Sequence, residues 1–125
     1  MVKIGKVIEI ILYVKEMDSQ VGFYRDVLGL EIVTPKGLET YVDQMWGTLD
    51  IGPCILALHG GGARDYGRDA PKFVFEVNEV ELTRGQLIER GVAMGEIRSP
   101  SPGVMVCDGK DPEGNWFSIE SQSAK

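Results

Sequence analysis

A weak internal repeat is the feature of this 125-residue chain that most restricts its fold. An apolar, alternating segment runs through Glu16 into a helix-like segment that stops at Gly29, and the same plan returns at Glu79 and Gly91. The glutamate-to-glutamate and glycine-to-glycine spacings differ by a single residue. Repeats of this length are typical of paired supersecondary units that share a core. The sequence therefore predicts two copies of one unit, with residues at equivalent positions converging at the seam between them.

Composition and charge exclude several classes of protein. The length is that of one domain, and 43% hydrophobic with 26% charged residues is ordinary for a globular protein. A formal net charge of −6 argues against nucleic acid and anionic membranes as partners. There is no membrane-spanning apolar run and no signal-peptide pattern, so a cytoplasmic location is expected. Cys54 and Cys107 are predicted to be reduced thiols.

Alternation, helical spacing and turn residues predict the same order of elements in both halves. The first half is predicted to hold a helix from Met17 to Gly29 and strands at 6–15, 30–34, 40–49 and 54–59. The second half is predicted to hold a helix at 80–90 and strands at 71–78, 93–98, 104–107 and 115–121. Each half therefore reads β-α-β-β-β. We expect a single domain over 1–125, with a first unit at 5–60, a glycine-rich linker at 61–70 and a second unit at 71–121.

Two motifs in this order resemble one known family. FYRDVLGLEIV at 23–33 and DPEGNWFSIES at 111–121 are similar to motifs of the vicinal oxygen chelate superfamily, which includes glyoxalase I, extradiol dioxygenases, fosfomycin-resistance enzymes and bleomycin-resistance proteins. The resemblance extends over about 6–121. It implies the α+β glyoxalase/bleomycin resistance/dioxygenase fold, in which two βαβββ units form a cup-like mixed sheet. It also implies a homodimer.

The resemblance further implies where a metal would bind. Family members typically carry His, Glu, His and Glu at four strand positions that point into the cup. In this chain those positions fall on Glu9, Ala57, Lys72 and Ser118. Only Glu9 could ligate readily, because Ala57 has no donor atom and Lys72 brings a positive charge to the site. The sequence therefore predicts that the protein uses no metal cofactor.

A shifted metal site is the alternative. Residues two apart on a strand share a face, so His59 is expected beside Ala57 and Glu120 beside Ser118. Glu9, His59 and Glu120 would then form a carboxylate–histidine site for a divalent metal. Otherwise, His59 and Glu120 lie near solvent at strand ends, and Lys72 pairs with Glu9 across the seam.

Further side chains are expected to line the cup. Tyr13 and Glu76 share faces with Glu9 and Lys72, and large groups on nearby strands could stack on a flat or cationic ligand. The complete predicted ligand-binding set is Glu9, Tyr13, Trp46, His59, Lys72, Glu76, Met105, Trp116, Ser118 and Glu120. No catalytic residue is assigned.

The sequence favours one function and leaves two open. The favoured function is metal-independent binding of a small molecule, cationic or aromatic, in an aromatic and acidic cup. The second is a metal-dependent lyase, isomerase or dioxygenase of the glyoxalase type that uses the shifted site. The third is a domain for regulation or assembly, whose seam is filled by side chains.

Overall fold

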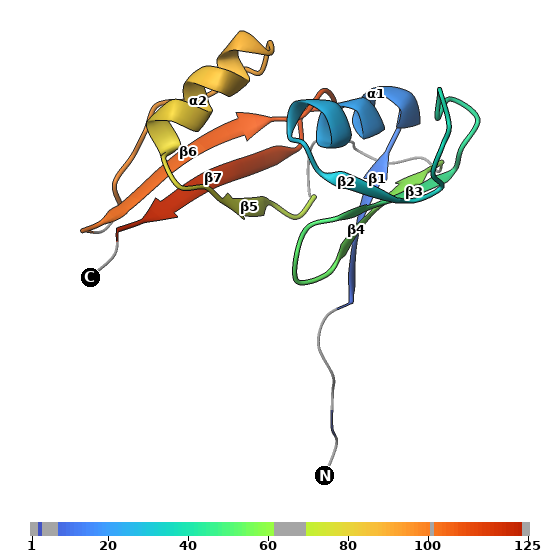
Figure 1. Cartoon of the computed structure of the whole chain (residues 1–125), viewed down its shortest axis with the longest axis horizontal. Coiled ribbons are helices and arrows are strands. Elements are labelled where there is room, and N and C mark those ends of the chain that lie inside the picture. Colours follow the sequence, from blue (N-terminus) through green and yellow to red (C-terminus); the bar gives the residue numbers. More distant parts are fainter. Residues whose placement is uncertain (1–2, 4–7, 62–69, 101, 124–125) are drawn as a thin grey trace. The chain divides into compact units, whose positions relative to one another are not determined.

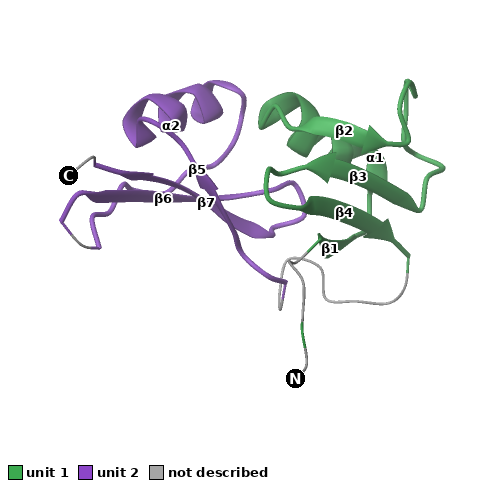
Figure 2. Ribbon diagram, turned by 60° about the horizontal axis from the view of Figure 1, so that its bottom comes forward, with its two compact units in different colours: residues 1–64 green, residues 65–125 purple. Residues whose placement is uncertain are grey.

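The chain forms two compact units, residues 1–64 and residues 65–125 (Figure 2). The structure, a computed structural model, describes residue 3 and residues 8–61, 70–100 and 102–123. Each unit is built on one mixed β-sheet with a helix packed against one of its faces (Figure 1). The α+β class predicted from the sequence is confirmed.

The described part of the first unit contains four strands and one interrupted helix. Its elements are β1 (Glu9–Val14), α1 (Met17–Gly22), the π-helical segment η1 (Phe23–Val27), β2 (Glu31–Thr34), β3 (Trp46–Asp50) and β4 (Ile55–Gly60). The strand order is β1-β4-β3-β2, with β4 parallel to β1 and antiparallel to β3. The helical stretch stops before Gly29, whose φ of 76° is a left-handed conformation that glycine adopts without strain.

The face of this sheet that contacts α1 forms the core of the first unit. It carries Leu12, Val14, Leu49, Leu56 and Leu58, which are at most 1% exposed. Burial of each such side chain stabilises the fold by about 1.5–3 kcal/mol. The helix lies close to the sheet, since a Cβ added at Gly47 would be 3.6 Å from Val21 Cγ2. The opposite face, called here the distal face of the first sheet, carries the alternate residues of each strand.

Over its described residues, the second unit repeats this plan with one strand fewer. Its elements are β5 (Phe73–Glu76), α2 (Val80–Glu89), β6 (Val104–Lys110) and β7 (Trp116–Gln122). The strand order is β5-β7-β6, with β7 parallel to β5 and antiparallel to β6. In both units the last strand thus pairs in parallel with the first. The internal repeat is therefore also a repeat of topology. The distal face of the second sheet is the face turned away from α2.

The predicted strand at 40–49 is wrong over its first half, because β3 begins only at Trp46. The Asp18 carboxylate of α1 accepts hydrogen bonds from the Tyr41 backbone N–H at 2.7 Å and from the Thr40 hydroxyl at 3.0 Å. The buried Tyr41 side chain donates its hydroxyl to the Pro35 carbonyl at 2.6 Å. These bonds bind residues 40–41 to the helix and to a neighbouring loop rather than to a strand.

The predicted strand at 93–98 contributes only two isolated bridges, Met94 to Gly109 and Arg98 to Val106. The carbonyl of Gly95 accepts hydrogen bonds from Arg84 Nε at 2.8 Å and from Cys107 Sγ at 3.2 Å. The Gly95 carbonyl is therefore bonded by side chains, whereas the Gly95 N–H still donates to the Asp108 carbonyl at 2.8 Å.

Several other predictions can be placed against the structure. Cys54 and Cys107 are free thiols, as expected. Neither helix of the described residues has the length and hydropathy needed to cross a membrane. Most of the predicted linker, and the start of the first predicted strand, lie outside the described residues.

Candidate functional site

The distal face of the first sheet carries three rows of side chains, because β1, β4 and β3 pair in one continuous register. Its three rows are Tyr13–His59–Trp46, Ile11–Ala57–Thr48 and Glu9–Ile55–Asp50. Successive rows are two strand positions apart, or about 7 Å. The prediction that His59 shares a face with Ala57 is confirmed.

The first row is a strip of aromatic rings across three strands. The His59 ring centroid lies 5.3 Å from that of Tyr13 and 5.5 Å from that of Trp46, which it meets edge to face. His59 Nδ1 lies 2.7 Å from the Gly60 carbonyl oxygen, which can only accept, so Nδ1 carries a proton and donates it. All three side chains are half-buried. The strip therefore offers ring faces and edges on which a flat group can stack.

The third row is acidic. Glu9 and Asp50 are exposed, and Glu31 of β2 pairs with Asp50, which adds a third exposed carboxylate to the row. The middle row lies between these two rows, and its small residues Ala57 and Thr48 are buried, so they do not protrude from the sheet. The distal face thus has rings at one end and carboxylates at the other, about 13 Å apart along the strands.

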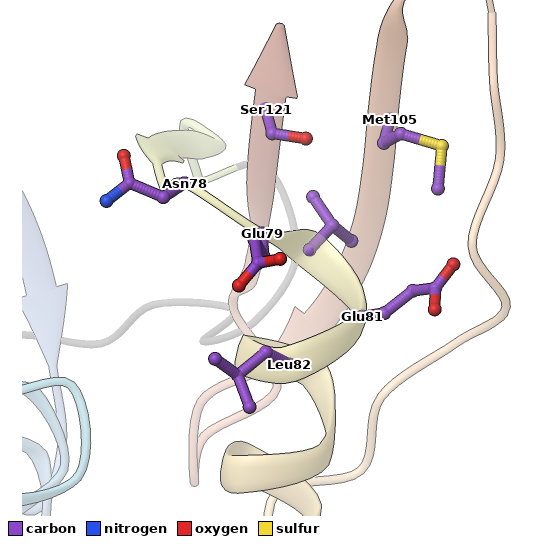
Figure 3. A pocket seen from close by; sticks show the side chains of 7 residues that line it. Asn78, Glu79, Glu81, Leu82, Met105 and Ser121 are labelled. Atoms are coloured by element: carbon purple, nitrogen blue, oxygen red, sulfur yellow. The ribbon is translucent and has the colours of Figure 1, made fainter. Parts of the chain in front are cut away.

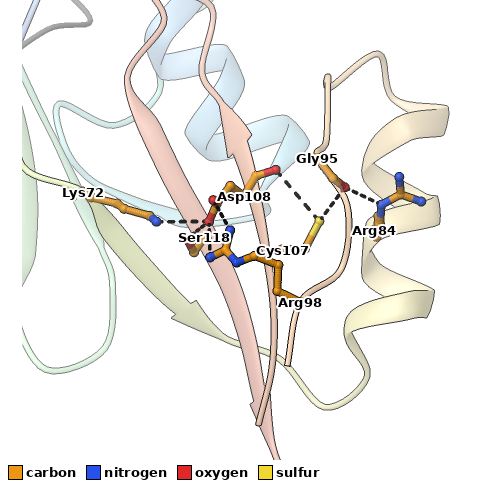
Figure 4. Close-up of polar contacts among 7 residues, drawn as sticks. All are labelled: Lys72, Arg84, Gly95, Arg98, Cys107, Asp108 and Ser118. Carbon is orange, nitrogen blue, oxygen red and sulfur yellow. Dashed lines mark hydrogen bonds and ion pairs between the residues drawn. The ribbon is translucent and has the colours of Figure 1, made fainter. Parts of the chain in front are cut away.

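The distal face of the second sheet carries a polar cluster around Asp108 (Figure 4). Its Oδ1 accepts hydrogen bonds from Lys72 Nζ at 3.0 Å and from Ser118 Oγ at 2.5 Å, and its Oδ2 accepts from Arg98 Nη1 at 2.7 Å. The bond from Arg98, followed by those from Ser118 and Lys72, holds the pKa of the Asp108 carboxyl well below its usual range. Asp108 therefore remains a carboxylate at any ordinary pH.

A buried turn sets the register that brings Asp108 beside Ser118. Asp111 Oδ1 accepts the backbone N–H groups of Glu113 and Asn115, each at 2.9 Å, and Asp111 Oδ2 accepts from Asn115 Nδ2 at 2.8 Å. The motif DPEGN therefore closes β6 onto β7 with Asp108 opposite Ser118. One of the two motifs that resemble the family therefore positions this cluster.

The remaining predicted residues of the second unit fall on both faces of its sheet. Glu76 pairs with Glu120, which shares the distal face with Ser118 as predicted. Trp116 lies on the same face, 48% exposed, with Lys110 Nζ 4.4 Å from its ring centroid.

Met105 does not join the other predicted residues of the second unit. It pairs with Ser121 on the face that packs against α2, so it points away from Ser118. Met105 borders a hollow of about 540 Å³ at the N-terminal end of α2 (Figure 3). The lining residues are Asn78, Glu79, Val80, Glu81, Leu82, Met105 and Ser121.

The residues at the four family ligand positions do not fit a divalent metal. Ala57 has no donor atom, and the Lys72 ammonium is bonded to Asp108 within its own unit. The predicted pairing of Lys72 with Glu9 stays a prediction. Glu9 pairs with Ile55, four positions from His59, so the shifted site would span about 13 Å within one sheet. Among the described residues, no three His, Cys, Asp or Glu side chains gather as metal ligands would.

Asp108 and Arg98 were not predicted as site residues. Residues 108–114 read as a turn because they are rich in Asp, Gly and Pro, whereas β6 in fact continues to Lys110. The alternation Val104, Val106, Asp108 was the available signal, since it extends one face of the strand to the carboxylate.

Comparison with solved structures shows the same fold in proteins of low sequence identity. An antibiotic binding protein, TnmS3 from Streptomyces sp. CB03234, is 18% identical, with a TM-score of 0.75 over 98% of this chain and 100% of that one. Lactoylglutathione lyase from Agrobacterium tumefaciens is 22% identical, with a TM-score of 0.70 over 92% of both chains. Virulence protein STM3117 from Salmonella typhimurium is 21% identical, with a TM-score of 0.72 over 98% of this chain and 100% of that one.

No curated protein matches the chain. One family model does, and it spans residues 6–119. This span includes almost all of both sheets, the first motif that resembles the family, and all but the last two residues of the second. The chain therefore belongs to the glyoxalase/bleomycin resistance protein/dioxygenase superfamily.

Proposed function

We propose that this protein binds a small, flat, cationic molecule without using a metal, on the distal face of the first sheet. The observation that carries the proposal is the strip of rings formed by Tyr13, His59 and Trp46. In this proposal, the strip and the carboxylate row are the aromatic and acidic parts of the cup expected from the sequence.

The aromatic strip supplies affinity. Three neighbouring rings on adjacent strands are held in place by sheet pairing, so a ligand that stacks on them orders few side chains. Stacking and edge-to-face contacts add about 0.5–1.5 kcal/mol per ring pair beyond the area buried. The low middle row leaves room for the ligand to extend from the rings along the strands.

The carboxylate row supplies charge selectivity. Glu9, Glu31 and Asp50 are exposed, so each attracts a cation only modestly through water. Together they favour a positive group about 13 Å from the rings over a neutral or negative one. An elongated ligand with a planar end and a cationic end matches this spacing.

Two further considerations support binding without a metal. The Lys72 ammonium and Ala57 stand where the resemblance places metal ligands. In addition, a solved structure with the same fold is that of an antibiotic binding protein. A binding role needs only the rings and carboxylates that the chain provides.

The proposal is tested by titration with 4′,6-diamidino-2-phenylindole, a planar cation, after treatment of the protein with a chelator. The expected result is saturable binding to one site per chain, and weaker binding of the neutral parent ring system 2-phenylindole. Trp46→Leu should raise the Kd of the cation about tenfold, equivalent to about 1.4 kcal/mol. Trp116→Leu, which removes the other tryptophan, should leave the Kd unchanged.

A Kd that is raised by Trp116→Leu and unchanged by Trp46→Leu would contradict the proposal. Equal binding of the charged and neutral compounds would contradict the role given to the carboxylates. Both results can be read without any assumption about the natural ligand.

The metal-dependent alternative remains open to a direct test. It requires Glu9 and His59 to act on one ion although the sheet register sets them four positions apart. A stoichiometric metal in protein purified without chelator, lost in Glu9→Ala, would support the alternative over the binding function.

A homodimer and a cytoplasmic location complete the proposal. The first rests on the family resemblance and is tested by sedimentation equilibrium. The second is the location expected from the sequence, and it is tested by cell fractionation.

A further inference from the structure

Three cations gather at one end of the distal face of the second sheet. Lys72 precedes Phe73, which pairs with Phe117, so Lys72 comes level with Trp116 in the sheet. Lys110 pairs with Trp116 from the other side. Arg98 reaches the adjacent row, where its guanidinium bonds to Asp108. We call Lys72, Arg98, Lys110 and Asp108 the cationic cluster.

The cationic cluster is positive although the protein is acidic. It contains three basic side chains and a single carboxylate, in a chain whose formal net charge is −6. The two carboxylates on the neighbouring row, Glu76 and Glu120, pair with each other across β5 and β7 and lie two positions further along these strands. The positive charge is therefore confined to one end of the face.

Asp108 uses only part of the hydrogen-bonding capacity of its two cations. An ammonium has three N–H donors and a guanidinium has five. Lys72 gives one hydrogen bond to Asp108 at 3.0 Å, and Arg98 gives two at 2.7 and 3.5 Å. The side chains of Lys72 and Arg98 are 43% and 52% exposed, so both cations are accessible from water.

Asp108 also fixes where those donors point. Its carboxylate is only 21% exposed and is held by the buried Ser118 hydroxyl, so it acts as a rigid anchor beneath the two cations. Cations that are already oriented lose less rotational freedom when they bind an anion. Arg and Lys are also the side chains that most often bind carboxylate and phosphate groups.

We infer that the cationic cluster binds an oxyanion, a carboxylate or phosphate group of a small molecule, between Lys72 Nζ and the guanidinium of Arg98. This site is separate from the ring strip of the first sheet and does not depend on the function proposed for that strip. Trp116 lies between the two lysines, and its half-exposed ring is available to the remainder of the molecule.

The inference is tested by ¹H–¹⁵N correlation spectra of the full chain, with inorganic phosphate and acetate added separately at constant ionic strength set by chloride. The expected result is a saturable shift of the backbone amides of Asp108 and Ser118, with a Kd on the order of millimolar for at least one anion. The two arms show whether phosphate or carboxylate binds more tightly.

Charge variants separate a specific site from general attraction. Lys72→Gln and Arg98→Gln should each weaken binding about tenfold, whereas Lys36→Gln, which removes an exposed lysine of the first unit, should change it less than twofold. Asp108→Asn should tighten binding, because the amide oxygen can still accept hydrogen bonds from the two cations while the negative charge that repels an anion is removed. Each variant is checked for folding by its amide spectrum.

Two results would overturn the inference. One is the absence of a saturable shift at Asp108 and Ser118 with both anions. The other is an equal loss of affinity in Lys72→Gln and Lys36→Gln, which would mean that only net charge matters. If 4′,6-diamidino-2-phenylindole did not bind at the first sheet, these outcomes would be unchanged, so the two proposals are tested independently.

Discussion

Removal of the Asp108 carboxylate tests the physical account of the second sheet. In Asp108→Ala, the Ser118 hydroxyl loses its partner while only 1% exposed, and Lys72 and Arg98 lose theirs while about half exposed. These losses differ in kind. Water can solvate the released cations, but it cannot easily reach the hydroxyl.

The expected magnitudes follow from that difference. An unpaired buried hydroxyl costs about 1–3 kcal/mol, whereas each exposed ion pair contributes about 0–1 kcal/mol. Asp108→Ala should therefore lower the free energy of unfolding by about 1–5 kcal/mol, the sum of one such hydroxyl and two such ion pairs. Adding Ser118→Ala should recover part of this loss, because the orphaned hydroxyl is then absent. The coupling energy between Asp108 and Ser118 should be about 1–2 kcal/mol.

The assay is urea denaturation of the wild type, the two single variants and the double variant. A parallel cycle with Lys72→Ala serves as the matched control and should give a coupling energy below about 0.5 kcal/mol, because Lys72 is exposed. A coupling of Asp108 to Ser118 no larger than its coupling to Lys72 would refute the reasoning that burial, rather than charge, dominates this cluster.

Three further predictions concern packing, pH and metal. Gly109→Ala should lower the free energy of unfolding by about 1–3 kcal/mol, because the new Cβ would lie 2.8 Å from Cζ of the buried Phe117 ring. In the control variant Gly85→Ala of α2, the new Cβ has no neighbour within 4 Å. This variant should raise the free energy of unfolding by about 0.5–1 kcal/mol in the same urea assay. The pKa of Asp108 is lowered by folding, so its carboxylate stabilises the folded protein above its unfolded pKa of about 4, and this stability is lost as the pH falls toward the folded pKa. The difference in free energy of unfolding between wild type and Asp108→Asn should therefore shrink by about 1 kcal/mol between pH 5 and pH 3. Removal of metal with a chelator should leave the midpoint of thermal unfolding and the Kd of 4′,6-diamidino-2-phenylindole unchanged. A loss of binding that is restored by one added metal would contradict this expectation.

The repeat made most of the fold predictable. Each helix is followed by a glycine with positive φ, so local chemistry and overall topology agree at Gly29 and Gly91. The segment at 40–45 was mispredicted because its apolar residues suggest a strand, whereas the decisive contacts come from Asp18, more than 20 residues earlier. Such long-range hydrogen bonds leave no mark on local periodicity.

The candidate site was predictable only where alternation applied. Strand period alone placed Tyr13 with Glu9 and His59 with Ala57 on single faces. It could not show that β4 lies parallel to β1 in a register that aligns His59 with Tyr13 rather than with Glu9. That register separates the aromatic row from the acidic row, and it depends on the pairing of segments that lie far apart in the sequence.

The indole N–H signals of Trp46 and Trp116 provide the most direct test of the central claim, because the chain contains only these two tryptophans. In a ¹H–¹⁵N correlation spectrum of chelator-treated protein, added 4′,6-diamidino-2-phenylindole should shift the Trp46 signal in a saturable way and leave the Trp116 signal in place. A shift confined to Trp116, or none at either tryptophan, would contradict binding at the aromatic strip of the first sheet.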